Sequence, residues 1–258
     1  MTARERKLKT ACYKKPYLKQ VIARIDFVSP IVALEKTLPT ELAKVASLHF
    51  PISEPVDVIA KNFQLSLTGA VQQSEKPFKQ WNFFGKEREK QLTLATSFFN
   101  LVYTRYTTYE DMKKHISVIV DALAKEFPEV RAARFGLRFV NVIEDIPLDS
   151  PITWDDYIAK ELHGMNAFLS MSNPLTRLMH LAELKSGEMD VRFQFGMPNP
   201  DYPAVMKRPQ FVLDLDAYIQ TAHILSDSLN YVENAHSVIQ DLFERSITEK
   251  LRMRMNAK

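Results

Sequence analysis

The sequence predicts an α+β fold: antiparallel β-sheets in two meander-like halves, packed by a central helix and a long C-terminal helix. Three patterns carry this prediction. Residues 188–197 alternate without error between apolar and polar side chains beside a Ser-Gly turn, which is typical of a β-hairpin. Apolar residues recur at helical spacing over 112–127 and again over 225–243. The two helices are therefore expected to bury one face each.

Alternating apolar residues place strands along the first half of the chain. Prolines interrupt residues 30–55, where a short helix near 40–48 is expected. Thr107 and Glu110 have the spacing of a capping box, so the central helix is expected to start there and to end at Pro128. The strands expected in this half cover residues 21–28, 62–71, 79–87, 91–106 and 130–144.

The second half begins after a proline-marked joint near 145–152. A short helix is expected from Thr153 to just before Gly164, and the terminal helix is expected to break near 245–247. The strands expected here cover residues 175–185, 188–197 and 210–218. We therefore predict a basic, flexible N-terminal arm at 1–19 and two α+β halves at 20–148 and 149–258, in one compact unit or two.

Composition excludes several classes of protein. The 258 residues are 46% hydrophobic and 25% charged, which is ordinary for a folded chain, and a net charge of +3 gives no global basic field for nucleic acid. Cys12 is the only cysteine, so no intramolecular disulfide can form. No apolar run approaches the roughly 18 residues that cross a bilayer. We expect a cytoplasmic protein that does not bind membranes.

Several segments together resemble a sporadically distributed, functionally uncharacterised family of prokaryotic proteins of about this length. The segments RFGLRFVN at 134–141, FGMPNPDYP at 195–203 and FVLDLDAY at 211–218 carry the likeness most specifically, and the match extends over nearly the whole chain. The resemblance implies no catalytic residue. It implies patchy distribution, hence carriage with mobile-element or defence loci, and favours an accessory or interaction protein.

Compact catalytic motifs are missing from the sequence. The six glycines are too widely spaced for G-x-G-x-x-G or for a phosphate-binding loop, no serine lies in a G-x-S-x-G elbow, and the six histidines form no H-x-x-x-H pair. Distant residues could still meet in the fold, so catalysis stays open, but a protein that is not an enzyme and has no cofactor is favoured.

Two charged groups on predicted strands could carry binding chemistry. Asp214 and Asp216 are two residues apart, so both carboxylates project from one face, an arrangement that can hold Mg²⁺ through oxygen ligands. Arg134 and Arg138 share a face in the same way, with Gly136 between them, and Arg192 lies on the hairpin. These arginines could grip a phosphate or carboxylate, or could pair with acids on neighbouring strands. If both groups face one cleft, they form a candidate ligand site.

Three functions follow from these features. The first is a protein that binds a partner protein through a sheet edge or through the terminal helix; self-association as a homodimer also stays open. The alternative is a nucleotide- or nucleic-acid-directed protein that uses the arginines for phosphate and the aspartates for a metal. The third is a binder of a small ligand in a pocket between the sheet and the helices.

Overall fold

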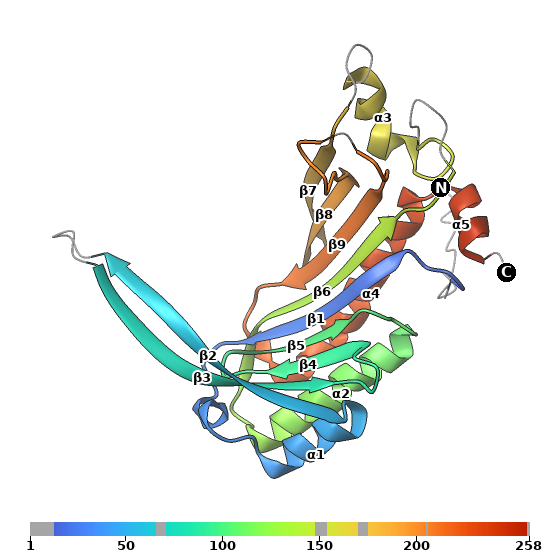
Figure 1. Cartoon of the computed structure of the whole chain (residues 1–258). Coiled ribbons are helices and arrows are strands. Elements are labelled where there is room, and N and C mark those ends of the chain that lie inside the picture. The colour runs from blue at the N-terminus through green and yellow to red at the C-terminus, as the bar shows by residue number, and fades with distance from the viewer. Residues whose placement is uncertain (1–12, 66–70, 148–153, 170–174, 205, 257–258) are drawn as a thin grey trace. The chain divides into compact units, whose positions relative to one another are not determined.

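The computed structural model in Figure 1 describes residues 13–65, 71–147, 154–169, 175–204 and 206–256. The α+β class is confirmed, because hydrogen-bonded neighbours in an antiparallel sheet follow the order β2-β3-β4-β5-β1-β6-β9-β8-β7, β10 pairs with β6, and helices accompany the strands. The strands are β1 (Leu18–Phe27), β2 (Ile52–Leu65), β3 (Val71–Phe84), β4 (Lys90–Leu94), β5 (Phe98–Tyr103), β6 (Arg131–Ile143), β7 (Leu178–Ser186), β8 (Met189–Met197), β9 (Phe211–Ile219) and β10 (His223–Ile224). The α-helices are α1 (Thr40–His49), α2 (Tyr109–Glu126), α3 (Lys160–Leu169), α4 (Ser228–Ser246) and α5 (Glu249–Asn256), with 3-10 turns at Val32–Glu35 and Leu225–Asp227.

Two compact units share the chain, and each is assembled from separated segments. The first, which we call the ribbon unit, comprises residues 21–136 and 219–232; the second, the hairpin unit, comprises 1–20, 137–218 and 233–258. This division differs from the two consecutive halves expected from the sequence. The reason is that β1, β6 and α4 are long elements, and each contributes residues to both units.

In the ribbon unit, α1 and α2 lie on one face of the sheet (Figure 1). Alternation in β1 buries Val21, Ala23 and Ile25, while the apolar stripe of α2 buries residues from Met112 to Leu123. α2 starts one residue later than its sequence predicts: the N-cap is Thr108, whose hydroxyl accepts a hydrogen bond from the backbone amide of Asp111 at 3.1 Å. Thr107 does not cap the helix.

β2 and β3 form a ribbon that extends beyond the rest of their sheet. They pair along their whole length, but only Trp81–Phe84 of β3 also pair with β4. The remaining pairs, from Val56↔Gln80 to Leu65↔Val71, therefore belong to a two-stranded ribbon about 33 Å long, as judged from the rise of an extended chain (Figure 1). Of the single strand predicted over 62–71, residues 62–65 belong to β2 and residue 71 begins β3, while residues 66–70 lie outside the described part of the chain. The start of β2 is not predicted, because Pro55 is taken as a strand breaker.

In the hairpin unit, β7 and β8 form the predicted hairpin. Every residue from Leu178↔Met197 to Ser186↔Met189 is paired, and Gly187 occupies the turn with φ +59°, a conformation that favours glycine. β9 pairs with β8, and it confirms the strand predicted over residues 210–218. The break in the terminal helix is confirmed between α4 and α5.

The N-terminal segment is anchored where the structure describes it. Tyr13 donates a hydrogen bond to Glu244 of α4 at 2.6 Å, the amide of Lys15 donates to the carbonyl of Met255 at 2.9 Å, and Arg254 donates to the Tyr17 hydroxyl at 3.0 Å. Residues 13–17 of the predicted flexible arm are thus bound to helices of their own unit. Residues 1–12, including Cys12, lie outside the described part of the chain.

Two predicted elements have different limits in the structure. The single strand expected over 91–106 is two strands, β4 and β5, because the chain turns at Ala95, whose amide donates to the carbonyl of Phe98. The short helix expected from Thr153, a residue outside the described part of the chain, starts at Lys160 in the structure and continues through Gly164. The preceding residues cannot extend it, since Ile158 forms a β-bridge with Ile247.

Candidate functional site

Four of the five charged residues proposed from the sequence line one pocket of the hairpin unit. Arg138 comes from β6, Arg192 from β8, and Asp214 and Asp216 from β9; Gln194 of β8 completes the lining. Adjacent strands place these residues together, because Arg192 is the register partner of Asp216 and Gln194 is the partner of Asp214. The pocket has a volume of about 120 Å³, enough for a small ion or a few waters.

Arg138 and Asp214 form the central ion pair of this pocket. The arginine Nε donates to one carboxylate oxygen at 2.7 Å and its Nη2 donates to the other at 2.5 Å, in the bidentate geometry that makes such pairs specific. The Asp214 side chain is only 10% exposed, whereas that of Arg138 is 44% exposed. Hydrogen bonding to Asp214 raises the pKa of the Arg138 guanidinium above its ordinary value. Both oxygens of this aspartate are thus engaged.

Arg192 belongs to a row of alternating charges across three strands. Its guanidinium donates to Glu183 of β7 at 2.9 Å, and its register partner on the other side is Asp216. The cross-strand pairing expected for the arginines is therefore present. Opposite charges alternate along the row and partly neutralise one another, which stabilises neighbouring strands but leaves little net field for an incoming ion.

Arg134, the fifth proposed residue, does not line this pocket. It belongs to the ribbon unit, and its Nη1 lies 4.0 Å from Asp26, which also accepts two hydrogen bonds from Arg24. Its guanidinium also lies over Gly136, where a β-carbon would come within 2.5 Å of Nη1. The space that Gly136 leaves is thus filled by an arginine of the same strand rather than by a ligand.

Metal binding by the aspartates would require rearrangement. Among the residues that the structure describes, no group of three or more His, Cys, Asp or Glu side chains is arranged to hold an ion. Magnesium at Asp214 would also have to displace the Arg138 guanidinium from both carboxylate oxygens. Asp216 would then supply the second carboxylate ligand.

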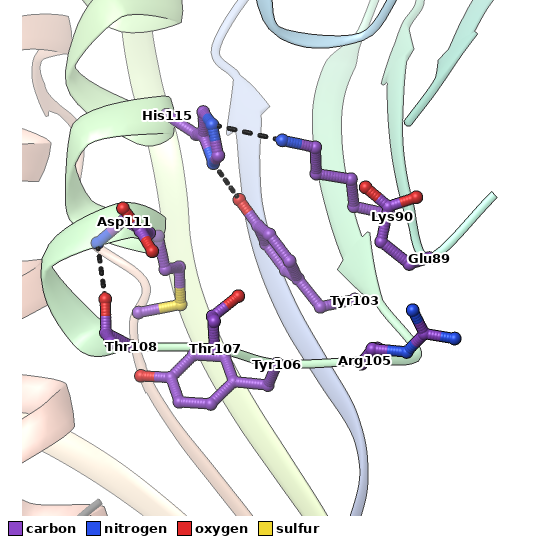
Figure 2. Close-up of a pocket in the computed structure, with 10 residues that line it drawn as sticks. Glu89, Lys90, Tyr103, Arg105, Tyr106, Thr107, Thr108, Asp111 and His115 are labelled. Carbon is purple, nitrogen blue, oxygen red and sulfur yellow. Dashed lines mark hydrogen bonds between the residues drawn. The ribbon is translucent and has the colours of Figure 1, made fainter. Parts of the chain in front are cut away.

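A second pocket lies in the ribbon unit between the sheet and α2, at the place proposed for a small ligand (Figure 2). Its volume is about 220 Å³. Lys90 and Tyr103 are register partners on β4 and β5, and both side chains reach His115 of α2. The lysine Nζ lies 3.3 Å from Nε2 of the imidazole, and the tyrosine hydroxyl lies 3.0 Å from Nδ1. The remaining lining residues are Glu89, Arg105, Tyr106, Thr107, Thr108, Asp111 and Met112.

Burial and neighbouring charges set the protonation states of His115 and Tyr103. Burial, aided by the charge of Lys90, lowers the pKa of His115 to about 4, so the imidazole is neutral at pH 7. Burial raises the pKa of the Tyr103 hydroxyl, which therefore keeps its proton. The ammonium of Lys90 also lies 5.0 Å from the centre of the Phe50 ring, a favourable cation–π distance.

Sequence reasoning missed the pocket of Lys90, Tyr103 and His115. One clue was present: His115 follows Met112 by three residues, so it lies on the apolar stripe of a predicted helix, where a polar side chain needs a partner. Lys90 and Tyr103 gave no comparable clue, because their strand pairing was not predicted.

Comparisons with protein-family models, curated proteins and solved structures found no match to this chain. The likeness to a sporadically distributed prokaryotic family therefore stays a prediction. Within the described residues, no helix combines the length and apolar character that crossing a bilayer requires.

Proposed function

We propose that this chain is an accessory protein that binds a partner protein along the β2–β3 ribbon. The ribbon carries the proposal, because residues 71–80 of β3 and their partners in β2 pair only with each other among the described residues. Isolated two-stranded hairpins are marginally stable in water, and open strand edges invite pairing with another chain. A partner that adds a strand to either edge would satisfy the open backbone groups and stabilise the ribbon.

Side chains near the base of the ribbon support a protein partner. Val56 and Ile59 are 46% and 56% exposed, and their odd spacing places them on opposite faces of β2. Pro55 and Pro77 lie within the strands, where proline is tolerated on edges and limits indiscriminate pairing. A specific partner can therefore use apolar contacts on either face as well as backbone hydrogen bonds.

The test is to shorten the ribbon and ask whether the partner is lost. Replacing residues 59–77 with Asn-Gly would join Val58 to Phe78, which are register partners, through a tight turn. The full chain and the shortened chain would each be purified from the native host and analysed by native mass spectrometry. We expect a bound protein with the full chain alone, while both chains keep the same cooperative unfolding. Equal recovery of a partner by both, or a full chain that captures none, would contradict the proposal.

As a matched control, Leu48→Asp changes another exposed apolar residue, 78% exposed on α1, and should leave the partner bound. Ile59→Asp makes the same kind of change within the ribbon and should weaken binding. Carriage with mobile-element or defence loci, which the family resemblance implies, stays a prediction about where such a partner would be encoded.

A second candidate function uses the pocket of Arg138, Arg192, Asp214 and Asp216. The observation that favours it is that four residues chosen from the sequence line one pocket. It predicts that nucleotides or oligonucleotides bind, with magnesium at the aspartates, that Arg138→Ala weakens binding, and that affinity falls with salt. Arg245→Ala, at an exposed arginine of α4, is the control. If the affinity for these ligands changes neither in Arg138→Ala nor with the salt concentration, this candidate function is excluded.

A further inference from the structure

We infer that the pocket of Lys90, Tyr103 and His115 binds the oxyanion group, carboxylate or phosphate, of a small molecule. This site is independent of the partner proposed for the ribbon. The argument starts from the lysine. Its only hydrogen bond within the described residues goes to His115, and no carboxylate in that part of the chain forms an ion pair with it. A partly buried ammonium without an anionic partner is costly, and an anionic ligand would offset this cost.

The hydrogen-bond directions lead to the same conclusion. An ammonium can only donate, so Nε2 of the neutral His115 ring accepts from Lys90, and the ring proton is on Nδ1. Nδ1 then donates to the Tyr103 oxygen, which leaves the phenolic proton to be donated elsewhere. The hydroxyl makes no other hydrogen bond among the described residues. The pocket in Figure 2 therefore presents two donors, the Lys90 ammonium and the Tyr103 phenol, and no carboxylate among the described residues is hydrogen-bonded to either of them.

Among the described residues, neither acidic group at the pocket is hydrogen-bonded to Lys90 or to Tyr103. The carboxylate of Glu89 is engaged within the β3–β4 turn, where its Oε2 accepts a hydrogen bond from the backbone amide of Glu87 at 3.0 Å. Arg105, the second cation of the lining, is paired with Glu87. Asp111 lines the pocket in the first turn of α2. Its carboxylate favours a ligand that carries a hydroxyl or ammonium donor in addition to its oxyanion.

Space for the rest of such a ligand lies beside Lys90. A second hollow, of about 480 Å³, shares Glu89, Lys90, Arg105 and Thr107 with the pocket. Lys90 thus borders both hollows. A small metabolite could bind its oxyanion at Lys90 and Tyr103 and extend its remaining atoms into the neighbouring hollow. The pocket itself, at about 220 Å³, suits a ligand of about the size of an amino acid, a hydroxy acid or a sugar phosphate.

The experiment titrates the intact protein with two probes, inorganic phosphate and acetate, at constant ionic strength with chloride as reference. The imidazole nitrogens of His115 are followed by ¹⁵N NMR, because they are hydrogen-bonded to the two proposed donors, Lys90 and Tyr103. We expect saturable shifts of the His115 signals with at least one probe. Shifts with phosphate alone or with acetate alone each support the site and identify which oxyanion it takes.

Variants of Lys90 test the assignment. Lys90→Gln should weaken binding roughly tenfold or more, since a charge-assisted hydrogen bond is lost, while Lys90→Arg should retain it. Lys44→Gln, an exposed lysine of α1 paired with Glu41, is the matched control and should bind as the unmodified protein does. If neither probe moves the His115 signals, or if Lys90→Gln binds as tightly as the control, the inference is overturned.

Discussion

Gly196→Ala should destabilise the hairpin unit strongly, because two separate features of this position exclude a side chain. Its φ of +139° lies in a region that L-residues rarely adopt, which costs about 1–3 kcal/mol. A β-carbon there would lie 2.2 Å from the carbonyl oxygen of Leu178 and 3.0 Å from the Cα of Met179. Both obstacles are backbone of the paired strand β7, so relief requires the strands to move apart, at a further cost of about 1–3 kcal/mol.

We expect a total loss of about 4 kcal/mol in the free energy of unfolding. With a urea dependence of about 3 kcal/mol per molar, the midpoint of unfolding should fall by about 1.3 M. Urea denaturation of the intact chain, followed by circular dichroism, measures this change. Gly164→Ala is the matched control in the same unit, since nothing lies within 4 Å of the added carbon and the residue is inside α3.

The control should shift the midpoint in the opposite direction. Alanine stabilises a helix interior by about 0.5–1 kcal/mol relative to glycine, so Gly164→Ala should raise the midpoint by about 0.2–0.3 M. A loss of less than about 1 kcal/mol in Gly196→Ala would refute the reasoning about the close approach of β7 and β8. A fall of equal size in both variants would show that the effect is not specific to this position.

Three further predictions concern α2 and the two pockets. Thr108→Ala should cost about 1 kcal/mol of unfolding free energy in urea melts, whereas Thr107→Ala should change it by less than about 0.5, because only Thr108 caps the helix. His115 has a pKa of about 4 in the folded state, below its ordinary value near 6.5. As the pH falls, the imidazole is therefore protonated in the unfolded state before it is protonated in the folded state. Stability should therefore fall by up to about 3 kcal/mol as pH drops from 6.5 to 4, and His115→Gln should remove this part of the pH dependence in melts at several pH values. A double-mutant cycle of Arg138→Met and Asp214→Asn should give a coupling of about 1–2 kcal/mol, and a coupling near zero would show that the bidentate pair contributes nothing.

Local pattern predicted the elements whose side chains and turn residues agree. In β8, apolar residues alternate without error and Gly187 meets the turn's need for positive φ, so strand and turn together determine the register. The ribbon is not predicted, because in β2 the local sequence signal and the observed structure disagree. Pro55 normally argues against a strand, but β2 is at the edge of its sheet and needs no hydrogen bond on its outer side, so proline does not break it. Edge position depends on tertiary structure and is not visible in a local window.

The candidate sites were predictable only as far as they depend on local spacing. Asp214 and Asp216 are two residues apart on a strand, so their shared face follows from the sequence. Arg138 meets Asp214 across a separation of 76 residues, through a pairing of β6 with β9 that no local pattern specifies. The same limit applies to Lys90 and His115, which come from a strand and a helix and meet only when α2 packs on the sheet.

The two pockets differ in whether the protein satisfies its own charged groups. Arg138 makes a bidentate bond with a largely buried aspartate, and Arg192 pairs with Glu183, so a ligand entering that pocket must break bonds that already exist. Lys90 forms no ion pair within the described residues, and its only hydrogen bond goes to a neutral imidazole. An anion entering there gains an interaction without displacing one. By this comparison the arginine–aspartate pocket serves mainly to join β6, β8 and β9, and the lysine pocket is the better place to look for a ligand.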